Sequence, residues 1–473
     1  MPSAIKTEGP TTSTNPSRAM ASTTLSCDKR RTPLSRPNAT EVAAILLITI
    51  ISSTCTQPVT GETAFVFGGA GAAHATQGSG LLEAFPELRA VLRDHPELAA
   101  SFAAPWTDDG APALQRLWSS SALAGLHDRL SRDILGLRPD AVIGYSSGES
   151  NSLFSAGIWT DPDAMVREAD ADGLFSQKIG GRFDVLADAW GSREWETWTL
   201  LAPVEDVRAA VADEPRAHLA VIHTDTDCIV VGDPAACARV CARIGRSRCL
   251  RLHYDLVVHV PELRAVADEW LALHRRPVTP QDVRVYSCGH GGSYTPSSEA
   301  CAEAILLQAD RTLDFRAVVE SAWADGVRIF VEHGPQGSCA RWIRSILCDR
   351  DAVVVSLDRK GAGAEAVLEA AAALIAAGVD MDVERVTARI RPVPAARRPM
   401  RFAVHPPPVR LLDVPEVPMQ SMPPAPSLPS IALAGYAVPP LPASEEHGLD
   451  QAPAQPVAQP ARVVDAIPVG GQT

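Results

Sequence analysis

The chain has 473 residues, a formal net charge of −13, 46% hydrophobic residues and only 5% aromatic ones. Its length allows a sizeable core, in one large domain or in several ordinary ones. The acidic balance excludes a broad basic surface, so no nucleic-acid partner is predicted.

No pattern in the sequence indicates a membrane span, a metal site or a disulfide framework. The apolar run at 42–51 is too short to cross a bilayer. We interpret it as a stray buried strand or helix rather than an export signal, because it lies far from the N-terminus. The ten cysteines show no CxxC pair and no Cys/His grouping with zinc spacing. Such scattered thiols predict a metal-free protein in the reducing cytoplasm.

Composition predicts how the chain is divided. Residues 1–60 are rich in Ser, Thr and Pro, and prolines crowd again over 394–473. We interpret both segments as disordered, and the second as a tail or a linker to a neighbouring domain. The globular body between them divides into a first part at 61–194, an inserted unit at 195–257 and a second part at 258–393.

The first part alternates strand and helix. A short apolar strand at 63–67 runs into a Gly-rich turn at 68–73, and helical patterns follow over 80–137. A buried strand at 139–143 leads through Gly144-Tyr145-Ser146-Ser147-Gly148 into an apolar helical stretch. Strand, tight turn and helix, with a serine on the turn, is the context of a nucleophile elbow.

The inserted unit has a different order of elements. Its pattern is βαββαβ, which is typical of a ferredoxin-like unit; the strands are predicted at 197–201, 219–223, 228–231 and 249–253, and the helices at 204–212 and 233–244. Strands and helices then alternate over 283–376. The predicted fold class is therefore α/β, with a mostly parallel, hydrolase-like large subdomain and an inserted ferredoxin-like small subdomain.

Ser146 is the candidate nucleophile. A Gly-x-Ser-x-Gly pattern also arises by chance in ordinary turns, but the strand before it and the helix after it favour the functional interpretation. A serine needs a base. His259 follows the strand that leaves the inserted unit and precedes a helix, which favours it slightly by position, and His253, His290 and His333 remain competitors.

Four ordered segments carry a resemblance to a known family. Residues 67–73 (FGGAGAA) resemble FPGQGSQ, 144–149 (GYSSGE) resemble GHSLGE, 255–260 (DLVVHV) resemble DYASHS, and 330–335 (FVEHGP) resemble FVEVGP. These are the motifs of the malonyl/acyl-CoA:acyl carrier protein transacylase family, which includes the acyltransferase domains of polyketide synthases. The resemblance covers roughly 63–386. The residues GYSSGES and VEHGP are especially similar to those of synthases of the polyunsaturated-fatty-acid and glycolipid type.

The resemblance implies a role for each matched residue. Ser146 would be the nucleophile and His259 the general base, while backbone N–H groups of Ala70 and Ser147 would hold the oxyanion. The segment 312–315 occupies the place of the family's histidine-orienting carbonyl, so Asp314 is expected to orient His259 or to lie on the surface. Two further residues are expected to line the substrate pocket, Gly69 and Tyr145.

Two departures from the family pattern bear on the acyl group. The elbow histidine of the family is Tyr145 here, and the arginine that pairs with a malonyl carboxylate falls near Ala171. Arg167, one helical turn away, is the candidate replacement. Other side chains do not easily replace a bidentate Arg–carboxylate contact. Malonyl therefore remains the first expectation for the transferred acyl group, and a neutral acyl group is an open alternative.

The predicted function is transfer of an acyl group from CoA to an acyl carrier protein through an acyl-serine, in polyketide or fatty-acid biosynthesis. Acyl-CoA would be the donor and a carrier's phosphopantetheine the acceptor, with other synthase domains as partners and no bound cofactor. Two alternatives stay open: a serine thioesterase or hydrolase, and a non-catalytic acyltransferase-like docking domain.

Overall fold

The computed structural model describes residues 59–108 and 111–387. The predictions for the apolar run at 42–51 and for the Pro-rich segment at 394–473 lie outside the described residues. In the described ranges, no helix combines the length and the apolar character that crossing a bilayer requires.

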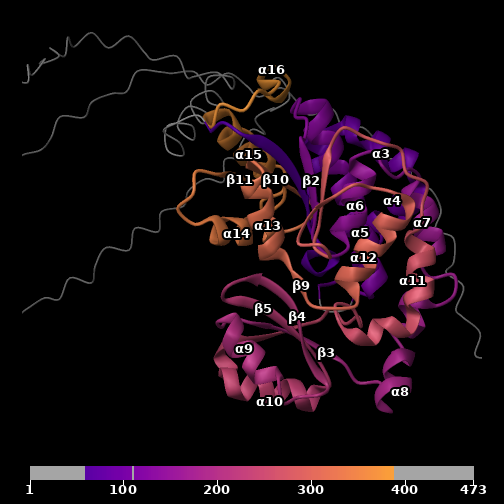
Figure 1. Ribbon diagram of the computed structural model, residues 1–473. Helices are drawn as coiled ribbons and strands as arrows, with labels where there is room; N and C mark the ends of the chain where they lie inside the picture. Colours follow the sequence, from indigo (N-terminus) through magenta and orange to yellow (C-terminus); the bar gives the residue numbers. More distant parts are fainter. Residues whose placement is uncertain (1–58, 109–110, 388–473) are drawn as a thin grey trace, which may run out of the picture. The chain divides into compact units, whose positions relative to one another are not determined.

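A six-stranded sheet forms the centre of the larger part of the fold (Figure 1), in the order β11-β10-β1-β2-β7-β8. All neighbouring strands are parallel except the pair β7 and β8. The prediction of a mostly parallel sheet is confirmed, while the edge strand β8 was not predicted. The strands are β1 (Glu62–Phe67), β2 (Ala141–Gly144), β7 (Arg284–Ser287), β8 (Gly292–Tyr294), β10 (Val327–His333) and β11 (Val353–Ser356).

Helices cover both faces of this sheet, as buried parallel strands require. One side carries α5 (Ala113–Arg129), α6 (Gly148–Ser155) and α12 (Ser298–Ala309), and the other carries α13 (Phe315–Ala324) and α14 (Ser338–Leu347) (Figure 1). The remaining helices are α2 (Leu81–Ala84), α3 (Arg89–Asp94), α4 (Pro96–Ala103), α7 (Pro162–Glu168), α8 (Asp184–Trp190), α11 (Ala267–His274), α15 (Glu365–Ala376) and α16 (Val383–Thr387).

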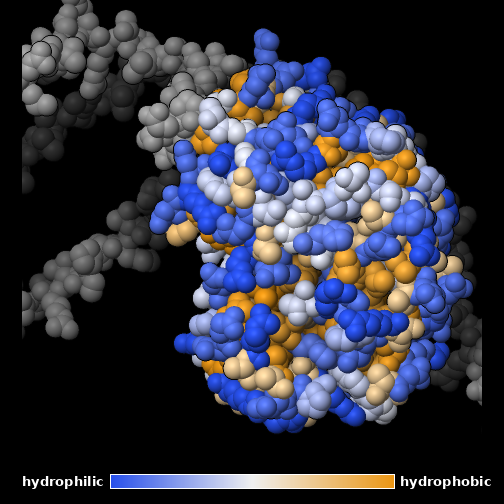
Figure 2. Space-filling model, in the orientation of Figure 1, coloured by the Kyte–Doolittle hydropathy of each residue, from blue (hydrophilic) through white to orange (hydrophobic). Residues whose placement is uncertain are grey.

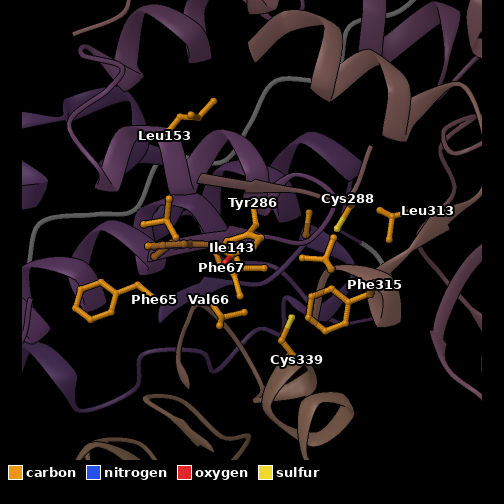
Figure 3. Packing of buried hydrophobic residues seen from close by; sticks show 14 of the residues in the cluster. Phe65, Val66, Phe67, Ile143, Leu153, Tyr286, Cys288, Leu313, Phe315 and Cys339 are labelled. Carbon is orange, nitrogen blue, oxygen red and sulfur yellow. The ribbon is translucent and has the colours of Figure 1, made fainter. Parts of the chain in front are cut away.

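The core of the larger part lies where the central strands meet these helices. Phe65 and Phe67 of β1, Ile143 of β2 and Tyr286 of β7 are buried together, and Phe315 approaches them from α13 (Figure 3). Each such side chain contributes about 1.5–3 kcal/mol by leaving water. This packing fixes β1 against β2, the two strands whose ends carry the Gly-rich turn and the serine turn.

A second sheet has its own hydrophobic core and the order β6-β3-β5-β4-β9. The predicted alternation βαββαβ is confirmed: β3 (Glu196–Leu200), α9 (Val204–Val211), β4 (Ala217–Thr224), β5 (Asp227–Gly232), α10 (Pro234–Ile244) and β6 (Cys249–Leu252). The short β9 (Leu313–Asp314) pairs in parallel with β4 and was not predicted. Two residues are too few to leave a strand pattern in the sequence.

The serine turn packs too tightly for side chains at its two glycines. A Cβ at Gly144 would lie 2.1 Å from the Cα of Glu149, and one at Gly148 would lie 2.0 Å from the backbone oxygen of Phe67. Real side chains do not tolerate such distances. The missing side chain at Gly144 therefore lets the turn close on the start of α6, and the one at Gly148 lets the turn approach β1.

Gly148→Ala should therefore destabilise the fold. We expect the free energy of unfolding to fall by about 1–3 kcal/mol or more, as for other overpacked sites, measured by denaturant unfolding. Gly125→Ala is the matched control. Gly125 lies inside helix α5, and a Cβ there would meet only the Val91 side chain, at the ordinary contact distance of 3.8 Å. That change should raise the stability by about 0.5–1 kcal/mol. Equal stabilities of the two variants would contradict the tight-turn account.

Candidate active site

Ser146 stands on a strained turn between β2 and α6. Its backbone φ is +55°, in the left-handed region that residues other than glycine rarely adopt. Such strain persists only where the surrounding structure holds it, and it is characteristic of functional turns. The turn presents the Ser146 hydroxyl above the carboxyl end of β2, next to the Gly-rich turn that follows β1.

His259 lies within hydrogen-bonding distance of this hydroxyl. The Oγ of Ser146 and the Nε2 of His259 are 3.0 Å apart, and the Nδ1 of His259 donates to the backbone oxygen of Gln308 at 2.6 Å. Because a carbonyl only accepts, Nδ1 carries the proton and Nε2 presents its lone pair to the serine. Burial lowers the pKa of His259 to about 4, against the opposing Gln308 hydrogen bond, so the imidazole is neutral at pH 7.

Gln308 contacts both members of this pair. Its side-chain Nε2 donates to the backbone oxygen of Ser146 at 3.1 Å, while its own carbonyl accepts from His259. Gln308 was not predicted from the sequence, because a main-chain carbonyl can belong to any residue type. Its place near the end of α12 could be inferred only from the three-dimensional fold.

Asp314 does not orient His259, contrary to one expectation. Its carboxylate caps α13 by accepting from the Ala317 N–H at 3.1 Å, and it pairs with Arg316 at 3.2 Å. The Nδ1 position that Asp314 would need is taken by the Gln308 carbonyl. A cap on the next helix explains this aspartate fully.

The two predicted oxyanion donors contact each other. The Ala70 N–H donates to the Oγ of Ser147 at 3.0 Å, so it must leave this bond to reach an oxyanion, and Ser147 occupies the N-cap position of α6. Gly69 borders the serine directly, because a Cβ there would lie 3.2 Å from the Cβ of Ser146. An oxyanion would thus meet the positive end of α6 and a Gly-rich turn that approaches closely.

Tyr145 joins the elbow to the second sheet. Its hydroxyl lies 2.8 Å from the Nε2 of His223 on β4, and the Nδ1 of His223 lies 3.0 Å from Asp227 on β5. The indole N–H of Trp342 donates to the other Asp227 oxygen at 3.0 Å, and its ring stacks on His223 with centroids 3.7 Å apart. The expected pocket-wall residue is therefore held in a partly buried polar network whose other members were not predicted from the sequence.

Arg167 does not take the place of the family arginine that pairs with a malonyl carboxylate. Its side chain is 53% exposed and lies 4.0 Å from Glu97 and 3.8 Å from Asp161. It is absent from the lining of both cavities that reach Ser146. The expectation for this residue was wrong because acidic neighbours hold the guanidinium at the surface.

Two cavities meet at Ser146 and His259. One, of about 370 Å³, extends between α5, α6, α11 and α12. The other, of about 810 Å³, lies between the Gly-rich turn, the second sheet and α14. On the face shown in Figure 2, hydrophobic side chains are exposed among polar ones over the part that carries the second sheet. A ligand threaded through both cavities would pass the Ser146 hydroxyl.

The described residues hold no cluster of three or more His, Cys, Asp or Glu side chains that could bind a metal ion. The chemistry available at this site is that of a serine, a neutral imidazole and main-chain dipoles. These groups suit nucleophilic attack on a carbonyl and stabilisation of the oxyanion that results.

Comparisons with known proteins found relatives among large synthases. No family model matches the chain. A polyunsaturated fatty acid synthase subunit of Thraustochytrium sp. is 27% identical over 46% of this chain and 12% of that protein. The spectinabilin polyketide synthase system protein NorA' of Streptomyces orinoci is 28% identical over 69% of this chain and 9% of that protein. The chain thus spans about an eighth or less of these relatives.

Solved structures share the fold. The acyltransferase domain from the second module of the salinomycin polyketide synthase matches with a TM-score of 0.60 and 23% identity, over 73% of this chain and 82% of that one. The chain therefore has the α/β fold of these acyltransferase domains. The predicted resemblance is confirmed: the chain is similar in sequence to polyunsaturated-fatty-acid and polyketide synthases, and in fold to a malonyl-CoA:acyl carrier protein transacylase and to polyketide-synthase acyltransferase domains.

The buried histidine predicts an unusual pH dependence. A base must be neutral to accept the serine proton, and the pKa of His259 is lowered to about 4. The rate at which Ser146 is acylated should therefore stay near its neutral-pH value down to about pH 5 and fall only on approach to pH 4. Rapid-quench measurement of the acyl-enzyme across this range checks it, with circular dichroism at each pH as the control for folding. A midpoint near the ordinary histidine value of about 6.5 would contradict the buried-base geometry.

The Ser147→Ala variant tests whether the oxyanion is held by main-chain N–H groups or by the Ser147 side chain. If the N–H groups of Ala70 and Ser147 are the donors, removing the Ser147 hydroxyl keeps both of them. The acylation rate should then change by less than about threefold, whereas loss of a true oxyanion donor costs about a hundredfold or more. Single-turnover kinetics of the variant beside the unmodified chain decides between the two.

Proposed function

We propose that this chain transfers an acyl group from CoA to the phosphopantetheine thiol of an acyl carrier protein, through an acyl-Ser146 intermediate. The observation that carries the proposal is the Ser146–His259 pair, 3.0 Å apart on a strained elbow, with the imidazole oriented by a backbone carbonyl. The relatives' names and the acyltransferase fold support the same class of reaction.

The first half-reaction loads the serine. The Ser146 oxygen attacks the thioester carbonyl while its proton passes to the Nε2 of His259, and the carbonyl oxygen becomes an oxyanion beside Ala70 and Ser147. Collapse of this intermediate breaks the carbon–sulfur bond. The proton on His259 then goes to the departing thiolate, so CoA leaves as a thiol and the serine carries an ester.

The second half-reaction reverses these steps with a different thiol. The neutral His259 accepts the proton of the phosphopantetheine thiol, whose sulfur attacks the acyl-serine, and the serine recovers its proton. The larger cavity, of about 810 Å³, lies on the thiol side of Ser146 and would hold the pantetheine arm. The carrier protein and other synthase domains are proposed partners, and no bound cofactor is needed.

The geometry favours transfer over the hydrolase alternative. Hydrolases with this elbow orient their histidine by an acid, whereas His259 meets the Gln308 carbonyl and Asp314 caps a helix. The docking-domain alternative does not account for a strained serine with a neutral base beside it.

The organisation of the chain is part of the proposal. The large sheet and the inserted βαββαβ sheet fit the predicted hydrolase-like and ferredoxin-like subdomains, divided at 61–194, 195–257 and 258–393. The cysteines in the described ranges are free thiols, which suits the proposed cytoplasmic location.

Ser146→Ala tests the intermediate. After incubation with acyl-CoA donors, intact-protein mass spectrometry should find one acyl group on the unmodified chain, and peptide mapping should place it on Ser146. The variant should lose this labelling by at least about a thousandfold, because Ser146 is the residue that His259 activates. Persistent labelling at another residue would contradict the assignment, and equal thermal unfolding of the two proteins is the control.

A further inference from the structure

The smaller cavity beside Ser146 has an apolar wall built from several helices. Leu117 of α5, Phe154 of α6, Leu273 of α11 and Ile305 of α12 all line its volume of about 370 Å³. This is room for about a dozen non-hydrogen atoms if each takes the ~30 Å³ share of a liquid water. A malonyl group has only a methylene and a carboxylate beyond its thioester carbonyl, so it would leave most of the cavity unfilled.

The charged side chains that line this cavity are mostly acidic. Asp94, Asp128 and Asp161 contribute carboxylates, and Arg129 contributes the one guanidinium among the described lining residues. Arg129 is already paired with Asp133 at 2.5 Å, and its side chain is 55% exposed. Burial raises the pKa of Asp128 even though it has an ion-pair partner. A second buried carboxylate would meet the same desolvation together with like charge.

A buried histidine of this cavity, His274, adds no positive charge inside it at pH 7. His274 is buried, its Nδ1 lies 2.7 Å from the Trp270 carbonyl, and burial lowers its pKa to about 4, so it is neutral at pH 7. His95 is half-buried on the lining beside Asp94. The described part of the wall thus offers no buried cation to a carboxylate.

Three buried N–H donors on this wall have no hydrogen-bond partner within the described residues: Asn151 Nδ2, Trp159 Nε1 and Trp270 Nε1. Their side chains are at most 8% exposed. Uncharged donors can bind water or a neutral oxygen of a ligand. Without a cation on this wall they would offset the charge of a buried carboxylate only in part.

Resting on the proposed acyltransferase function, we propose that this cavity selects an uncharged acyl chain of medium length, about six to ten carbons, over malonyl. The thioester carbonyl lies at Ser146 and the chain extends between α5 and α12, against the side chains of Leu117 and Ile305. Specificity then comes from apolar burial and from exclusion of a carboxylate.

A competition between CoA thioesters tests this directly. The full chain is incubated with an equimolar mixture of acetyl-, octanoyl- and malonyl-CoA, and each form of acyl-Ser146 is quantified by intact-protein mass spectrometry, with Ser146→Ala as the blank. Octanoyl should load at least about tenfold faster than malonyl, a difference of about 1.4 kcal/mol. Malonyl loading as fast as octanoyl or faster would overturn the inference and leave the proposed function standing. No loading by any donor would overturn both.

A variant that narrows the cavity tests where the acyl chain lies. Gly125 lines the cavity from the middle of α5, and a side chain there faces open space apart from Val91. Gly125→Leu should reduce octanoyl loading at least about tenfold more than acetyl loading, while the matched Gly125→Ala should discriminate far less. An equal loss for both chain lengths would show that the acyl chain lies elsewhere. Thermal unfolding establishes that each variant is folded, and the competition on the unmodified chain stands whatever the variants do.

Discussion

The site depends on the two hydrogen bonds that Gln308 makes. Its carbonyl accepts the Nδ1 proton of His259, and its side chain donates to the backbone oxygen of Ser146. The first bond fixes the tautomer that leaves a lone pair for the serine, and the second ties the strained turn to α12. Because a buried imidazole could otherwise rotate or carry its proton on the wrong nitrogen, this pair of contacts sets both the geometry and the chemistry.

The same arrangement separates the two ends of the substrate. Ser146 and His259 stand where an apolar cavity enclosed by helices meets a wider one bordered by the second sheet. Under the proposed function, the acyl group and the thiol carrier would therefore be recognised by different surfaces. The network of Tyr145, His223 and Asp227 links the elbow to the second sheet, so the two walls of the wider cavity are held in register.

Most of the fold could be predicted from the sequence, because buried parallel strands and amphipathic helices leave strong patterns. The sequence motifs also allowed Ser146 and His259 to be predicted as a pair, although they lie far apart in the chain. The failures have separate causes. Gln308 acts through its main chain, the Asp314 carboxylate serves a helix cap, and Arg167 is held by acidic neighbours. The Gln308 contact with His259 and the Arg167 contact with Glu97 join distant segments, which one sequence does not encode as a local pattern, whereas the Asp314 cap on Ala317 is local and is a role that an Asp before a helix commonly has.

The central claim is that acyl-Ser146 passes its acyl group to a thiol in preference to water. The most direct measurement isolates the acyl-enzyme and follows its decay by mass spectrometry, with and without a phosphopantetheine-bearing carrier protein. We predict that the carrier accelerates decay at least about tenfold and that the acyl group appears on its thiol. Decay at one rate in both conditions, with release of the free acid, would show a hydrolase and contradict this claim.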